Sequence, residues 1–102
     1  EIYHVSLSAE NSTVPVGFTI EQNYPNPFNP ATTVPVSIER ESIVNVSVYD
    51  INGSFIYSLH NGLMYPGKHE LVWNATEQPS GVYFIKANIG SEVYTIKTLL
   101  IK

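Results

Sequence analysis

The three histidines, His4, His60 and His69, are the first residues to consider for acid–base or metal chemistry. None of them is spaced from another histidine or a carboxylate so that one helix face would bring two ligands to a metal. His69 is two residues from Leu71 and four from Trp73, so it shares their strand face, which predicts a core or rim position and a hydrogen bond to the backbone. We therefore expect no catalytic or metal-binding histidine.

The carboxylates are equally poor candidates for catalysis or ion binding. Glu39 and Glu41 flank Arg40 in a polar stretch that is typical of a solvated hairpin tip. Asp50 and Asn52 offer two oxygens where Ca²⁺ takes about six to eight, so a turn capped by these side chains is favoured. The sequence has no Cys, nucleophile elbow, phosphate-binding glycine loop or zincin motif. None of these residues points to a catalytic, cofactor-binding or metal-binding site.

Composition narrows the function further. The chain has 102 residues, which suits one domain, and a net charge of −4, which offers no basic surface to nucleic acid. Charged residues make up only 14 %, against about 25 % in an average soluble domain. The longest wholly apolar run, residues 99–101, is far too short to span a bilayer. We expect neither a nucleic-acid partner nor a membrane span.

Strand-like alternation with a period of two recurs along the chain, and no window keeps the apolar stripe of a helix. From residue 18 onward, seven such segments follow one another, starting about 10–16 residues apart, close to the spacing of about 8–12 residues expected of an all-β sandwich. They cover residues 18–22, 34–38, 44–48, 55–59, 69–74, 82–89 and 92–101. The sequence thus predicts a seven-stranded, antiparallel sandwich of the immunoglobulin or fibronectin type III kind, with Trp73 in its centre.

Glycine and proline mark the connections between these strands. Asn52 and Gly53 favour a tight hairpin, because glycine accepts the positive φ that such turns need. Asn61 with Gly62 and Pro66 with Gly67 bracket the next predicted loop, and Gly90 with Ser91 joins the last two strands. Pro35 lacks a backbone donor, so its strand is predicted to be an edge strand or to contain a bulge.

The start of the chain is predicted to be distinct from the domain at residues 18–102. Residues 1–17 are interpreted as a short strand and a linker, the strand having the alternating apolar residues Tyr3, Val5 and Leu7. Because the chain starts at Glu1 rather than at Met, we expect a mature or excised piece of a longer protein.

Several motifs occur in an order that is typical of one family. Residues 23–33 read Asn-Tyr-Pro-Asn-Pro-Phe-Asn-Pro-Ala-Thr-Thr, and Val48-Tyr49-Asp50 with Gly53, Gly67-Lys68-His69, Trp73-Asn74, Ser80-Gly81-Val82-Tyr83-Phe84 and residues 97–102 follow. Over residues 18–102 the sequence resembles the type A C-terminal sorting domain of type IX secretion cargo. That family is related to the immunoglobulin-like domain of flagellar hook-capping proteins. The resemblance implies a structural role for the matched positions Tyr24, Pro25, Pro27, Phe28, Pro30, Gly53, Gly67, Trp73, Gly81 and Tyr83.

The resemblance implies a non-catalytic module that carries a larger protein through the outer membrane of a Gram-negative bacterium. The partner would be the outer-membrane secretion and attachment machinery, and the cargo would be secreted or held at the cell surface. The family further implies that the last strand and its basic end carry the sorting signal, here Lys97, Leu99, Leu100, Ile101 and Lys102. Ser54 departs from the family, in which Arg or Lys usually follows the hairpin glycine, and this weakens any charge contact there.

Two other functions stay open at this point. The chain could be a structural subunit that polymerises when residues 1–8, with Tyr3, Val5 and Leu7, add to the open sheet edge of a neighbour. The seven tyrosines also leave open a carbohydrate-binding accessory domain, in which solvent-facing rings stack on sugars.

Overall fold

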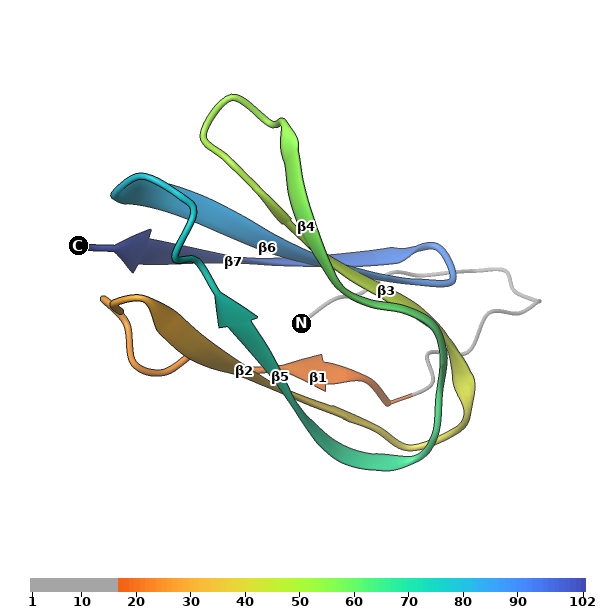
Figure 1. Cartoon of the computed structure of the whole chain (residues 1–102). Helices are drawn as coiled ribbons and strands as arrows, with labels where there is room; N and C mark the ends of the chain where they lie inside the picture. The colour runs from red at the N-terminus through yellow and green to blue at the C-terminus, as the bar shows by residue number, and fades with distance from the viewer. Residues whose placement is uncertain (1–16) are drawn as a thin grey trace.

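The computed structural model describes residues 17–102, and within them seven strands form two layers (Figure 1). The strands are β1 (Thr19–Ile20), β2 (Ala31–Ile38), β3 (Ser42–Tyr49), β4 (Phe55–Met64), β5 (Gly67–Asn74), β6 (Gly81–Ile89) and β7 (Glu92–Leu100). The predicted all-β sandwich is therefore confirmed. The strand predicted at Tyr3, Val5 and Leu7 lies outside the described residues.

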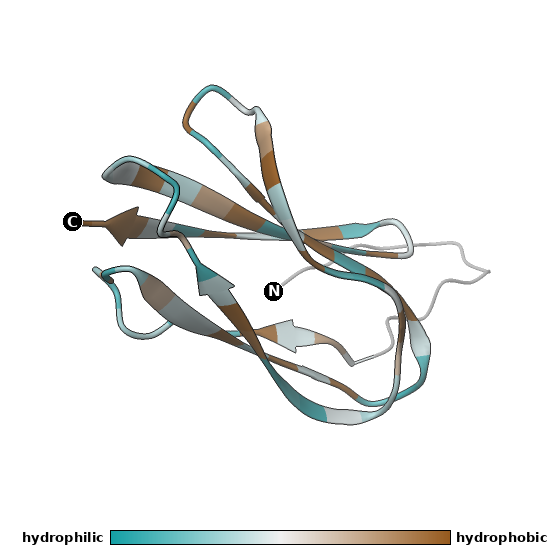
Figure 2. Ribbon diagram, viewed as in Figure 1, coloured by the Kyte–Doolittle hydropathy of each residue, from teal (hydrophilic) through white to brown (hydrophobic). Residues whose placement is uncertain are grey.

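The strands divide into two antiparallel sheets. One sheet has the order β1-β2-β5 and the other has the order β4-β3-β6-β7. Apolar and polar residues alternate along most strands, as the brown and teal bands of Figure 2 show. Because successive side chains of a strand point to opposite faces, this alternation turns one apolar face of each sheet toward the other.

The centre of the core is aromatic. Trp73 is 2 % exposed and lies between two other rings, with centroid distances of 5.4 Å to Phe28 and 5.2 Å to Tyr83. Such tilted and edge-to-face contacts are the favoured arrangements of aromatic pairs. Trp73 thus lies in the core, as expected from its position on the same strand face as Leu71.

Pro35 corrects the sequence prediction for its strand. β2 is the middle strand of its sheet, so it is not an edge strand, and its register with β5 runs through Pro35 without a bulge. The carbonyl oxygen of Pro35 accepts a hydrogen bond from the amide of Glu21, just after β1. In an antiparallel ladder the N–H and C=O of one residue point to the same side, so the missing donor of Pro35 faces the short β1. The pairing of β2 with β5 loses no bond.

A second correction concerns Asn61 and Gly62. They lie inside β4, opposite Asn45 and Val44 of β3, and not in a loop. β4 contains two register shifts relative to β3, which allow the strand to continue beyond the predicted end at residue 59. The hairpin predicted at Gly90 and Ser91 is present, since Ile89 pairs with Glu92.

Candidate functional site

The last residues of the chain lie between two loops at one end of the sandwich (Figure 1). We call residues 97–102 the terminal segment. The proline loop, residues 23–30, connects β1 to β2, and residues 75–80 connect β5 to β6. Both loops form hydrogen bonds with the terminal segment, which makes this end of the molecule the candidate site.

The proline loop cannot form an ordinary ladder, because Pro25, Pro27 and Pro30 have no backbone donor. All three X–Pro peptide bonds in this loop are cis. Tyr24 is paired to β2 by two bonds: its amide donates to the carbonyl oxygen of Thr33 over 2.9 Å, and its carbonyl oxygen accepts from the amide of Thr33 over 2.8 Å. The loop is thus held at its start by strand pairing.

Phe28 joins the proline loop to the terminal segment through its backbone. Its amide donates to the carbonyl oxygen of Leu99, and its carbonyl oxygen accepts from the amide of Ile101, both over 3.0 Å. These two bonds form a parallel bridge around Leu100, which is completely buried, next to the buried ring of Phe28. The proline loop therefore covers the last part of the β7 edge that faces away from β6.

A buried polar cluster connects the same two segments through side chains. The Asn23 amide nitrogen Nδ2 donates to the hydroxyl of Thr98 over 2.6 Å and to that of Thr32 over 2.8 Å. All three residues are at most 2 % exposed. Asn26 adds its Oδ1, which accepts from the backbone amide of Leu99 over 3.0 Å and from the Thr98 hydroxyl over 3.2 Å. Buried polar groups need such partners, so the cluster fixes the position of this part of β7.

Both ends of the terminal segment are also held. At its start, the side-chain amide of Gln22 donates to the carbonyl oxygen of Lys97 over 2.9 Å. At its end, the backbone amide of Lys102 donates to the hydroxyl of Ser80 over 2.9 Å. The Lys102 ammonium donates to the carbonyl oxygens of Thr76 and Gln78, over 2.6 and 2.9 Å. The Lys102 ammonium thus binds to backbone carbonyl oxygens of the domain itself.

The terminal segment has two faces. Thr98 and Leu100 form an inner row that is buried in the sandwich. Lys97, Leu99 and Ile101 form an outward row, in which Leu99 is 36 % and Ile101 is 51 % exposed. The five residues suggested by the family resemblance are therefore brought together in space, but Leu100 faces the core and Lys102 contacts the loop at residues 75–80.

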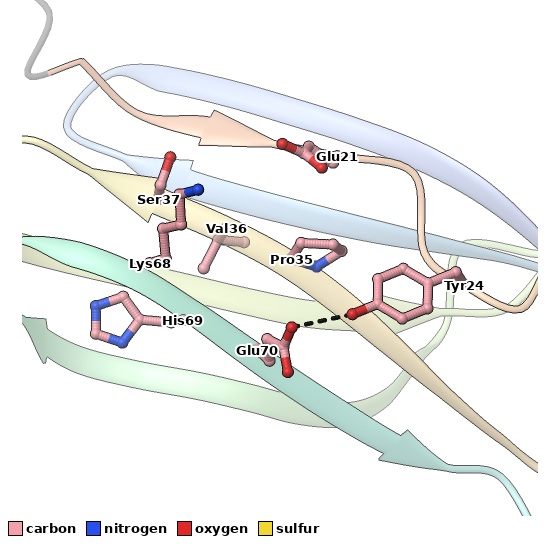
Figure 3. A pocket seen from close by; sticks show the side chains of 8 residues that line it. All are labelled: Glu21, Tyr24, Pro35, Val36, Ser37, Lys68, His69 and Glu70. Atoms are coloured by element: carbon pink, nitrogen blue, oxygen red, sulfur yellow. Dashed lines mark hydrogen bonds between the residues drawn. The ribbon is translucent and has the colours of Figure 1, made fainter.

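Tyr24 points to a different place, the outer face of the three-stranded sheet. Its hydroxyl donates to the Glu70 carboxylate over 3.0 Å, and this hydrogen bond is the main cause that raises the pKa of Tyr24 (Figure 3). Both residues line a pocket of about 210 Å³, together with Glu21, Lys68 and His69. Nε2 of His69 donates to the carbonyl oxygen of Tyr65 over 2.8 Å, which is the backbone contact predicted from the sequence.

The remaining motif residues shape turns and a corner. The Asp50 carboxylate accepts from the amides of Asn52 and Ser54, both over 2.9 Å, so its predicted capping of the turn is confirmed. Gly53 has a φ of +84°, a conformation that other residues rarely adopt. The Tyr83 hydroxyl donates to the carbonyl oxygen of Pro79 over 2.6 Å, and burial is the main cause that raises the pKa of Tyr83.

Two motif glycines begin strands, and the described residues hold neither a metal-ligand group nor a membrane-spanning helix. Gly67 and Gly81 begin β5 and β6, and both have positive φ. Among residues 17–102, no group of three or more His, Cys, Asp or Glu side chains could hold a metal ion. The same part of the chain has no helix of the length and apolar character that crossing a bilayer requires.

Sequence reasoning missed the side chains that hold the terminal segment: Gln22, Asn23, Asn26 and Ser80. Their partners are 22 to 75 residues away, and no local pattern indicates such pairs. Asn23 and Asn26 belong to the proline motif, and their regular spacing with the prolines was the one local feature that could have indicated a role for them.

Comparison with known proteins agrees with this geometry. A family model described as "Secretion system C-terminal sorting domain" matches residues 22–102. The match includes every residue that forms one of the described hydrogen bonds to the terminal segment, from Gln22 onward. No curated protein matches the chain.

Proposed function

Because the chain belongs to the family of secretion system C-terminal sorting domains, we propose that it directs the export and surface attachment of a larger cargo protein. The family supplies the C-terminal sorting signal of type IX secretion, so the cargo is secreted or surface-attached. The proposed partner is the outer-membrane secretion and attachment machinery of a Gram-negative bacterium.

The observation that carries the proposal is the arrangement of the terminal segment. Backbone bonds to Phe28 and the cluster around Asn23 hold the segment in place. The outward row of Lys97, Leu99 and Ile101 is then available to a partner. In this account the outward row is recognised, whereas Leu100 and Lys102 anchor it.

A non-catalytic role is supported by the contacts of the polar side chains. Nε2 of His60 donates to the carbonyl oxygen of Leu63, and Nε2 of His69 donates to that of Tyr65. The Asp50 carboxylate accepts hydrogen bonds from backbone amides of its own turn. These groups have structural partners and do not converge on a common cavity.

Likeness to the immunoglobulin fold is supported by one contact in particular. Tyr83 lies near the start of β6, and its hydroxyl donates to the backbone four residues upstream, at Pro79. This contact resembles the tyrosine corner of immunoglobulin-like sandwiches. This contact supports an immunoglobulin-like arrangement of the two sheets.

Export of a reporter tests the proposed function. A periplasmic reporter with the whole 102-residue chain at its C-terminus is expressed in a host with type IX secretion. We expect reporter activity in the medium or on the cell surface. The matched controls are the reporter alone and the fusion in a strain without a functional type IX channel, and both are expected to remain in the periplasm. Equal export of the reporter alone would contradict the proposal.

The two alternatives are tested by simpler measurements. Self-assembly through Tyr3, Val5 and Leu7 predicts large species in sedimentation that disappear when residues 1–8 are removed. A carbohydrate-binding role predicts binding on a glycan array. Either result would favour its own alternative over the sorting function.

A further inference from the structure

The outer face of the four-stranded sheet carries a row of side chains that crosses all four strands. Phe55 of β4 is opposite Tyr49 of β3, Tyr49 is opposite Phe84 of β6, and Phe84 is opposite Lys97 of β7. Directly opposite residues share a face, and Phe84 alternates with the buried Tyr83 and Ile85, so the row faces outward. We call the three rings of Phe55, Tyr49 and Phe84, with Lys97 at their end, the aromatic row.

The aromatic row is accessible and continues into the terminal segment. Phe55 is 59 % exposed and its ring lies edge-on to that of Tyr49, with a centroid distance of 6.0 Å. Leu99 pairs with Val82, next to the pair of Lys97 and Phe84. In Figure 2 the end of β7 has the brown colour of apolar residues. The exposed side chains of Phe55 and Leu99 are therefore connected across the sheet by the partly exposed Tyr49, Phe84 and Val82.

A shallow hollow lies beside the aromatic row. Its volume is about 290 Å³, and its lining includes Tyr49, Phe84, Lys86 and the 70 % exposed Ile51. Asp50 also lines it, but its carboxylate accepts the turn hydrogen bonds described above. The hollow can receive an apolar side chain from a partner.

The charge of this sheet differs from that of the whole chain. The net charge of the chain is −4, yet the four strands contain two lysines, Lys86 and Lys97, and one acid, Glu92 at the start of β7. The Lys86 ammonium lies 5.0 Å from the centroid of the Tyr49 ring, a cation–π distance. The aromatic row therefore has positive charge at two points along its length.

The opposite face of the molecule has another character. The outer face of the three-stranded sheet carries Glu21, Glu70 and Lys68 around the polar pocket of Figure 3. Exposed apolar side chains that lie side by side and are rimmed by polar groups are typical of an interaction site, and the sheet with the terminal segment carries such a group. The two faces thus provide an internal comparison.

We propose that the aromatic row and the outward row together form one docking surface for a protein partner with apolar groups and carboxylates. The lysines supply charge complementarity to the carboxylates, and Phe55, Leu99 and Ile51 supply apolar contacts. The aliphatic Leu99 and Ile51, which have no ring for a sugar to stack on, and the two lysines beside the aromatic rings favour a protein as the occupant. This inference rests on the proposed function, because it extends the recognised surface from β7 to β6, β3 and β4.

Export of reporter fusions with changes outside the terminal segment tests the docking surface. Phe55→Ser removes an exposed ring, and Lys86→Glu reverses a charge. Each is expected to lower export about tenfold or more, because central aromatic and charged residues dominate interface energies. Lys86→Arg keeps the charge and should be exported like the wild type. The fold of each variant is checked by its thermal unfolding.

Matched controls lie away from this surface. Val72→Ser changes a 61 % exposed residue of β5, and Arg40→Glu reverses an exposed charge between β2 and β3. Both are expected to leave export unchanged. Normal export of folded Phe55→Ser and Lys86→Glu would overturn the docking surface while leaving the sorting function intact. Failure of the wild-type fusion to leave the periplasm would overturn the sorting function, and the inference with it.

Sedimentation and glycan binding exclude the other occupants. If the purified chain forms a dimer that Phe55→Ser dissociates, the occupant is a second copy and the proposal is wrong. If it binds a glycan through Phe55, the occupant is a carbohydrate and the proposal is equally wrong. A monomer without glycan binding supports a protein partner.

Discussion

The side-chain amide of Asn23 donates a 2.6 Å hydrogen bond to the hydroxyl of Thr98, and both residues are buried. The two are 75 positions apart in the chain, at the start of the proline loop and near the end of β7. The bond makes the position of the terminal segment depend on the proline loop. The proline loop, although distant in sequence, therefore supports the segment in which the sorting signal is expected.

Replacing Thr98 by valine keeps the shape of the side chain and removes the hydroxyl. We expect Thr98→Val to lower the free energy of unfolding by about 1–3 kcal/mol, since the Asn23 amide loses a buried partner. Denaturant unfolding measures the change. Thr95→Val, at an exposed position of the same strand, should stay within about 0.5 kcal/mol of the wild type. Equal stability of the Thr98 and Thr95 variants would contradict the role of the cluster.

Leu99 and Leu100 are neighbours with opposite expected effects. Leu100 is completely buried, so Leu100→Ala should destabilise the domain by about 2–5 kcal/mol through lost burial and a cavity. Leu99→Ala should cost about 1 kcal/mol or less, because its side chain is 36 % exposed. Thermal unfolding distinguishes the two. A larger loss for Leu99 than for Leu100 would show that the two faces are assigned the wrong way round.

Alkaline pH should destabilise the domain through its tyrosines. Burial is the main cause that raises the pKa values of Tyr83 and Tyr94 above the ordinary value of 10.0, so folding favours their protonated forms. The resulting stability is fully present below pH 10 and is lost as the pH rises through the folded-state pKa values. We expect the free energy of unfolding to fall above about pH 10, and less steeply in Tyr83→Phe. An identical alkaline slope in this variant would contradict the prediction.

The contacts of Lys102 are expected to affect the end of the chain more than the stability of the whole domain. Lys102→Met removes the bonds from the ammonium to Thr76 and Gln78, and should lower global stability by about 1 kcal/mol or less. Amide hydrogen exchange at Ile101 should nevertheless become faster, because the end of the segment loses an anchor. Lys97→Met removes a lysine of the outward row and should leave this exchange unchanged. The same exchange rate in both variants would mean that Lys102 does not hold the segment.

The strands of the sandwich were predictable because the alternation of apolar and polar residues is a local pattern, and the strands of the structure keep it as alternating buried and exposed side chains. Leu71 and Trp73 face the core for the reason that their spacing indicated. The prediction for Pro35 was wrong because the rule considers a missing donor and not the side to which it points. The prediction for Asn61 and Gly62 was wrong because a bulged strand can pass through residues that usually favour turns.

The candidate site was predictable only in part. The family resemblance indicated the end of the chain, but the assignment of faces needed the pairing of Leu99 with Val82 and of Leu100 with Phe28. Contacts from Gln22 and Asn26 link distant parts of the sequence, and periodicity contains no information about them. The buried cluster therefore became visible only in three dimensions.

The central claim is that the outward row of the terminal segment carries the sorting signal while the inner row holds it in place. The most direct measurement is the export of a reporter fused to the whole chain with Lys97→Glu, Leu99→Ser and Ile101→Ser combined. Val93→Ser, at a 60 % exposed position near the start of β7, is the matched control. We predict that the triple variant folds and is exported about tenfold less or worse, while the control is exported normally. Normal export of the folded triple variant would contradict the account.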